Sequence, residues 1–105
     1  MESIYDKNPE IMKQKLIRRR IDDLDFSCKI FEQYFYEQNK ENGKKDYKEC
    51  LGLLNAYKKT YNKNILVELL LVIKKYKPNS EGLYNCITYS TKIINDIMNV
   101  WFMNV

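Results

Sequence analysis

The residue patterns that signal catalysis are absent from this 105-residue chain. It contains no histidine, which removes Ser-His and Cys-His nucleophile pairs and histidine-based metal sites. It also lacks a glycine-rich phosphate-binding loop. The best acidic group is Asp22, Asp23 and Asp25. It suits a solvated helix face better than a hard cation, because oxygen-ligand sites usually need more carboxylates and a turn glycine. The sequence therefore predicts a non-enzyme with no cofactor and no metal.

Three cysteines, Cys28, Cys50 and Cys86, are isolated along the chain and odd in number. No pair has the spacing of metal ligands, and each falls on an apolar helix face. We therefore expect buried, reduced thiols rather than a disulfide or a zinc site. The first thirty residues lack the continuous apolar segment of a signal peptide, so we expect an intracellular protein, nuclear or cytoplasmic and not secreted.

Basic residues cluster in the run Lys13–Arg20, within a chain of net charge +4. Such a run is compatible with a localisation signal or a phosphate-contacting patch. A charged outer helix face with Leu16 and Ile17 packed inward is the plainer interpretation, because residues 2–25 also contain six acidic residues that dilute the field. The net charge is too small to argue for nucleic acid as the main partner.

Helical spacing dominates the rest of the chain. Apolar residues recur every three or four positions from Ile17 to Phe35, which predicts a helix of about five turns that starts at Asn8-Pro9-Glu10. Phe26 and Ile30 lie on its opposite face, so they are either covered on a second side or exposed as an apolar patch. A break at residues 22–25 would divide this helix into two.

Residues 39–45 read as a loop, and Asp46 with Glu49 forms a capping box for a second helix. Gly52 lies in the middle of that helix and would allow another helix to approach closely. Asn64 is a plausible cap for the third helix, and a last apolar stripe runs over residues 83–101.

The third helix is built on Ile65–Ile73, in which eight of nine residues are aliphatic. It is too short to span a bilayer, and its neighbours read as amphipathic helices. We therefore expect an all-α fold, a compact bundle of four to five helices around a central hydrophobic helix at residues 65–76. Residues 1–105 form a single helical domain, with residues 1–7 loose.

The order of elements from residue 46 onward resembles the TFIIS N-terminal-domain superfamily, the helical modules of transcription elongation regulators. The match is closest in pattern to its integrase-binding branch. The residues that carry it are Asp46-x-x-x-Cys50-Leu51-x-x-Leu54, Ile73-Lys74-Lys75-Tyr76-Lys77, Ile87-x-x-x-Thr91-x-x-Ile94 and Ile97-Met98-x-x-Trp101-Phe102. It departs from the branch at Asn42 and Gly43, where relatives carry an Ile-Asp pair that contacts partners.

This resemblance implies a scaffold that binds short disordered peptides on its interhelical loops, often acidic ones that carry Phe. The candidate partner-binding residues are Tyr76, Lys74, Lys75, Lys77, Asn42 and Gly43. For Tyr76, at a helix-to-loop corner, capping the edge of the core is an equally good interpretation. The lysines agree with an acidic partner. The partner is then a protein, either a short segment or a larger complex, with no membrane insertion.

Two other classes of function stay open. The apolar excess at Phe26, Ile30, Phe102 and Met103 is compatible with a small structural subunit of a larger assembly. The small size and the Lys- and Asn-rich composition typical of an AT-rich genome are compatible with a helical antagonist of a host factor, encoded by a virus or a parasite.

Overall fold

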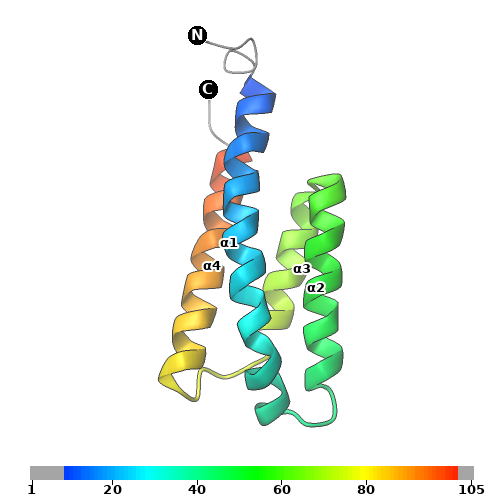
Figure 1. The fold of residues 1–105 in the computed structure, drawn as a ribbon, viewed down its shortest axis with the longest axis vertical. Helices are drawn as coiled ribbons and strands as arrows, with labels where there is room; N and C mark the ends of the chain where they lie inside the picture. The colour runs from blue at the N-terminus through cyan, green and yellow to red at the C-terminus, as the bar shows by residue number, and fades with distance from the viewer. Residues whose placement is uncertain (1–8, 102–105) are drawn as a thin grey trace.

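The computed structural model describes residues 9–101, and they form four α-helices that run alternately up and down in one elongated bundle of 52 × 25 × 22 Å (Figure 1). The helices are α1 (Pro9–Gln38), α2 (Gly43–Thr60), α3 (Lys63–Ile73) and α4 (Glu81–Trp101). The described part of the chain contains no strand, which confirms the predicted all-α bundle. The expectations for residues 1–7 and for the Asn8 cap lie outside the described residues.

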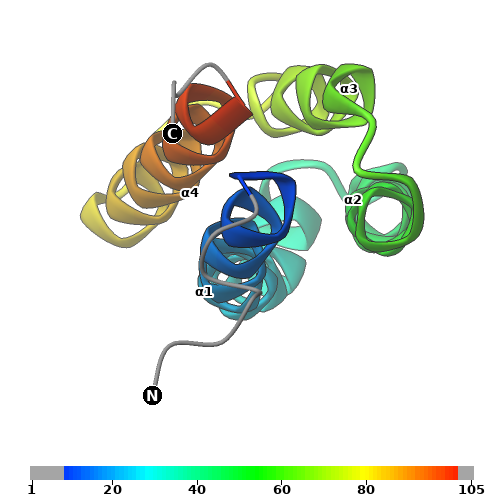
Figure 2. The ribbon, with the colours of Figure 1, turned by 90° about the horizontal axis from the view of Figure 1, so that it is seen from above.

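The four helices are arranged as a ring in cross-section. Both α1 and α3 pack against α2 and against α4, and α1 and α3 lie on opposite corners, as the view along the bundle shows (Figure 2). The hydrophobic core fills the space between them. Because neighbours in sequence are also neighbours in the ring, short connections suffice at each end.

The apolar stripe of α1 was predicted correctly along its whole length. Its residues from Ile17 to Phe35 at the three- and four-residue spacing are all buried. On α4, Leu83, Ile94 and Ile97 are likewise buried. The 3.6-residue period of a helix places such residues on one face, and that face makes the core.

The first helix is continuous, so the expected break at residues 22–25 does not occur. The acidic side chains there are paired instead: Asp23 contacts Arg20 one turn before it, and Asp25 contacts Lys58 on α2. These carboxylates therefore form ion pairs at the surface of α1, and each costs the helix little free energy.

The third helix is not at the centre of the bundle, contrary to the prediction for residues 65–76. It forms one corner of the ring and ends at Ile73. Leu66 and Leu69 face the core, whereas Val67 is 44% exposed and Leu71 is 62% exposed. An aliphatic run predicts burial, but it does not show how many helices are available to cover it. Here only two helices, α2 and α4, pack against α3.

The starts of the second and third helices also differ from the prediction. The second helix begins at Gly43, so Asp46 lies inside its first turn and does not form a capping box with Glu49. The third helix is capped by Asn62, whose side-chain oxygen accepts a hydrogen bond from the backbone N–H of Asn64 at 3.0 Å. In both cases the helix starts earlier than the predicted cap.

The three cysteines are free, as expected, but only two are fully buried. Burial raises the pKa of the Cys28 thiol from 9.0 to about 12, with a further contribution from the Asp25 carboxylate. Burial also raises the pKa of the Cys50 thiol. Cys86 is partly exposed, which corrects its predicted burial. Among residues 9–101, no helix has both the length and the apolar character needed to cross a membrane.

Candidate functional site

Two connections that are far apart in sequence meet at one end of the bundle. The turn between α1 and α2 lies beside residues 74–77, which follow α3. Gln38 joins them through two hydrogen bonds: its Nε2 donates to the Lys77 carbonyl at 2.8 Å, and its Oε1 accepts from the Lys77 N–H at 2.8 Å. We call this surface, residues 37–49 and 74–77, the lysine corner. The predicted site residues are therefore brought together.

Tyr76 lies beneath this surface, with 5% of the residue exposed. Its ring stacks on Phe35 with the ring centroids 3.9 Å apart, and its hydroxyl donates to Asp46 Oδ2 at 2.5 Å. Burial raises the pKa of the Tyr76 hydroxyl above 10.0, and the bond to Asp46 raises it further. The hydroxyl is thus a permanent donor at neutral pH. The ring is part of the core, so the structure agrees with the interpretation of Tyr76 as a cap on the core edge, and its role in partner binding stays a prediction.

Asp46 explains why Tyr76 turns inward. The residue lies in the first turn of α2 and is 7% exposed. Its carboxylate has two partners, the Tyr76 hydroxyl and the Lys75 ammonium, whose Nζ lies 3.6 Å from Oδ1. A buried carboxylate needs such partners, since an unpaired one costs several kcal/mol. Asp46, which the sequence suggested as a helix cap, instead forms a polar link between α2 and the residues that follow α3.

Gly43 also has a structural role. A Cβ atom built there would lie 2.6 Å from the carbonyl carbon of Phe35 and 2.7 Å from the Cα of Tyr36. The start of α2 therefore rests directly on the backbone of α1. Gly43 is buried against α1, and its part in partner binding stays a prediction. Gly52 has no such contact, so the close approach predicted there occurs at Gly43 instead.

The remaining predicted site residues, Asn42, Lys74, Lys75 and Lys77, are exposed. A polar pocket of about 340 Å³ opens between the two connections, lined by Asn39, Asn42, Lys45, Asp46, Glu49 and Lys75. The lysine corner contains seven lysines and four acidic residues, a net charge of +3 out of the +4 of the whole chain. Most of the positive charge excess therefore lies in the lysine corner, although the pocket itself is lined by two lysines and two carboxylates.

Replacing Tyr76 by Phe is expected to lower the free energy of unfolding by about 1–3 kcal/mol, because the buried Asp46 carboxylate loses one of its two partners. The stack on Phe35 would be kept. Tyr84, which is 56% exposed, provides the control, and Tyr84→Phe should leave the stability unchanged. Urea unfolding of both variants measures the difference. Equal stabilities would mean that the Tyr76–Asp46 bond contributes nothing.

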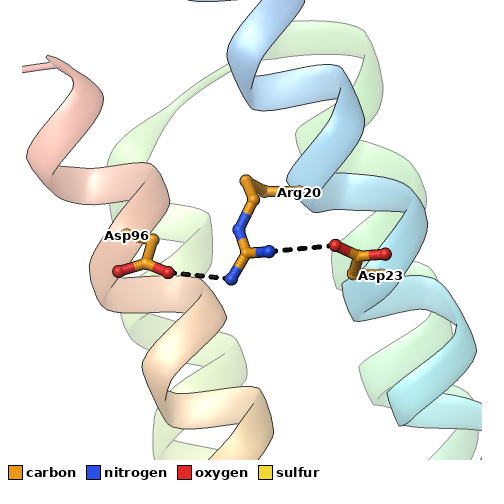
Figure 3. A network of polar contacts seen from close by, with 3 residues as sticks. All are labelled: Arg20, Asp23 and Asp96. Atoms are coloured by element: carbon orange, nitrogen blue, oxygen red, sulfur yellow. Dashed lines mark hydrogen bonds and ion pairs between the residues drawn. The ribbon is translucent and has the colours of Figure 1, made fainter.

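The basic run Lys13–Arg20 is partly occupied by contacts within the protein. Arg20 binds Asp23 through Nη1 at 3.0 Å and Asp96 of α4 through Nη2 at 2.8 Å (Figure 3). Arg18 donates from Nε to the Tyr61 hydroxyl at 3.3 Å. The guanidinium of Arg20 is therefore a link between α1 and α4 and not a free phosphate contact. Across residues 9–101, no three Cys, Asp or Glu side chains come together to hold a metal ion.

A second surface lies between α1 and α4. It is an open apolar groove of about 310 Å³, lined by Phe26, Ser27, Ile30, Asn85, Cys86 and Tyr89. We call it the α1–α4 groove. The sequence indicated that Phe26 and Ile30 were off the main stripe, but it gave no sign that Cys86 and Tyr89 would lie opposite them. Only the pairing of α1 with α4 reveals this.

Comparison with protein-family models, curated proteins and solved structures gives no match for this chain. The resemblance to the TFIIS N-terminal-domain superfamily therefore stays a prediction.

Proposed function

We propose that this chain is a non-catalytic protein-interaction module that binds a short acidic segment of a partner protein at the lysine corner. One observation carries the proposal: two connections that carry seven lysines with the start of α2 are tied together by Gln38, and they enclose a pocket that Lys45 and Lys75 line. A non-catalytic role is favoured because the chain contains no histidine and because the pKa values of the buried Cys28 and Cys50 thiols are raised.

The pocket has the groups that an acidic segment needs. The ammonium group of Lys45 can pair with a carboxylate, whereas that of Lys75 already contacts Asp46. The side-chain amides of Asn39 and Asn42 can bond to a peptide backbone. Positive charge spread over a surface mainly accelerates encounter with an acidic partner and selects against basic ones. A segment that carries a Phe, as the resemblance implies, would need an apolar contact at the edge of the pocket.

The frame beneath the pocket is fixed before any partner arrives. Tyr76 is held by Asp46 and Phe35, and residue 77 is held by Gln38. Such preorganisation reduces the entropy lost on binding. The residues beneath the pocket therefore fix its shape, and the exposed lysines supply the positive charge that attracts an acidic segment.

The test uses a labelled synthetic peptide of Asp, Glu and Ser with one Phe, titrated by fluorescence anisotropy at several salt concentrations. Reversing the charge at Lys45, Lys74 and Lys77 to Glu is expected to weaken binding by about tenfold or more and to flatten its salt dependence. The matched control reverses Lys29, Lys59 and Lys92, which are exposed outside the lysine corner. It changes the net charge equally, and screening over about 8 Å should keep its effect small.

Three outcomes would count against the proposal. If the acidic peptide binds no more tightly than a peptide in which Lys replaces its acidic residues, the proposal is wrong. Equal losses in the two triple variants would mean that only net charge matters. A loss that follows reduced thermal stability of the variant would place the effect in folding rather than in recognition.

A further inference from the structure

The end of the bundle opposite the lysine corner has a step between α1 and the turn that joins α2 to α3. Arg18 marks the level of this turn, because its Nε donates to the Tyr61 hydroxyl at 3.3 Å. The helix α1 continues beyond the turn (Figure 1). At 1.5 Å per residue, residues 9–17 add about 13 Å of helix. The side of α1 that faces the turn therefore forms the wall of a step, and the turn forms its floor.

Two open pockets lie along this step and share Arg18. The first pocket, of about 280 Å³, is lined by Arg18, Ile21, Asp22, Lys58 and Tyr61. The second pocket, of about 270 Å³, is lined by Ile11, Gln14, Lys15 and Arg18. Because the two pockets meet at one side chain, they form a continuous surface. We call residues 9–22 and 58–63 the basic notch.

Positive charge is concentrated in the basic notch. It contains two carboxylates, Glu10 and Asp22, and eight cations: Lys13, Lys15, Arg18, Arg19, Arg20, Lys58, Lys59 and Lys63. Two of these cations form ion pairs with carboxylates outside the notch, Arg20 with Asp23 and Asp96, and Lys58 with Asp25. With these pairs set aside, an excess of four positive charges remains. The net charge of the whole chain hides this excess, because the residues outside the notch and the lysine corner are acidic on balance.

Tyr61 brings an aromatic ring to the same surface. It follows α2 with a φ of 53°, and it is the only residue with a positive φ among those that the structure describes. Glycine usually fills such a position after a helix, because L side chains rarely adopt this conformation. The residue is half-buried and lines the notch beside Arg18 and Lys58. The backbone therefore adopts an unfavourable conformation at the residue that gives the notch its ring.

We propose that the basic notch binds a short stretch of single-stranded nucleic acid. Such strands are bound by cations that follow the phosphates and by an aromatic ring on which a base can stack. Lys15 and Arg18 lie on the wall of the step. The exposed Lys59 and Lys63 lie on either side of the turn. All three arginines of the chain belong to the notch, and guanidinium groups form paired hydrogen bonds to phosphate oxygens.

Two other polyanions fit this surface less well. A duplex has its bases stacked on one another, so it offers no base to Tyr61. An anionic membrane is bound best by a surface that also inserts apolar side chains. The large apolar side chains that are exposed among the described residues all lie outside the notch.

The first test titrates a labelled oligothymidylate of about 12 nucleotides by fluorescence anisotropy at several salt concentrations. About four phosphate contacts predict a slope of about −3 for the logarithm of the association constant against the logarithm of the salt concentration. The combined variant Lys15→Glu, Lys59→Glu and Lys63→Glu should bind the oligonucleotide at least about tenfold more weakly.

The matched control reverses Lys45, Lys74 and Lys77 to Glu in the lysine corner. It changes the net charge equally, and screening over about 8 Å should keep its effect on oligonucleotide binding small. This inference is independent of the proposed function, because the two surfaces share no residue. The acidic peptide tests that independence: the notch variant should bind it as the unchanged protein does. Failure of peptide binding alone would therefore leave this inference standing.

Two further measurements do not depend on charge reversal. Tyr61→Leu, which removes the ring, should weaken oligonucleotide binding at least about fivefold, whereas Tyr61→Phe, which keeps the ring, should weaken it less. In the unchanged protein, the amide NMR signals that the oligonucleotide shifts should belong to residues 9–22 and 58–63. Circular dichroism checks that each variant folds.

Four results would each overturn the proposal. They are equal losses in the two charge variants, equal losses in Tyr61→Leu and Tyr61→Phe, shifted NMR signals that centre on the lysine corner, and a duplex or vesicles of anionic lipid bound as tightly as the single strand.

Discussion

Replacing Leu69 by Ala should lower the free energy of unfolding by about 2–5 kcal/mol, while the same change at Leu71 should alter it by no more than about 0.5 kcal/mol. Leu69 is fully buried, and its removal loses both apolar burial and close packing. Leu71 is 62% exposed two residues later. Leu70, which is partly buried, should fall between them.

This series is measured by urea unfolding of the three variants at matched conditions. The three residues share one side-chain type and one helix, so differences in helix propensity cancel between them. Equal losses at Leu69 and Leu71 would contradict the corner position of α3. They would instead agree with the enclosed position that the aliphatic run suggests.

The second large effect is expected at Gly43. Gly43→Ala should destabilise the fold by about 3 kcal/mol, because the new methyl group meets the backbone of Phe35 and Tyr36, which cannot rotate away as a side chain can. The start of α2 would have to move off α1. Since Asp46 lies one turn further along α2, its contact with Tyr76 would be disturbed as well.

Gly52→Ala supplies a control of the opposite sign. Apart from the adjoining residues and backbone of α2 itself, no atom lies within 4 Å of the Cβ position there. The substitution should therefore stabilise α2 by about 0.5–1 kcal/mol through helix propensity and a less flexible unfolded chain. Thermal and urea unfolding of both variants measure this contrast. A neutral or stabilising Gly43→Ala would show that the two helices do not touch as closely as the structure indicates.

The features that the sequence predicted correctly are those that depend on local periodicity. The spacing from Ile17 to Phe35 identified one face of α1 correctly, because a helix places every third and fourth residue on the same side. Ser90 sits at an apolar-stripe position of α4 and is fully buried, as its place in the stripe implied. The helix count and the all-α class follow from the same information.

The candidate site could not be predicted in the same way, because its residues are placed by contacts between distant segments. Tyr76 follows a helix and precedes Pro78, a position that suits an exposed corner as well as it suits the edge of the core. Only Asp46 and Phe35, thirty and more positions earlier, turn it inward. Likewise, the sequence placed Gly43 in a loop and favoured Gly52 for the close approach of another helix, and only the packing of α1 shows that the approach occurs at Gly43.

The hydroxyl groups of Ser27 and Ser90 lie 2.5 Å apart in the interior, where α1 meets α4. Sliding one helix past the other by a turn, about 5.4 Å, would leave both hydroxyls among apolar side chains without a partner. Each would then cost about 1–3 kcal/mol. Leucine and isoleucine would tolerate the slipped arrangement far better, since they fit many neighbours. Together with the ion pair between Arg20 and Asp96, this buried polar pair therefore favours one alignment of α1 against α4 over alignments that the apolar residues would tolerate.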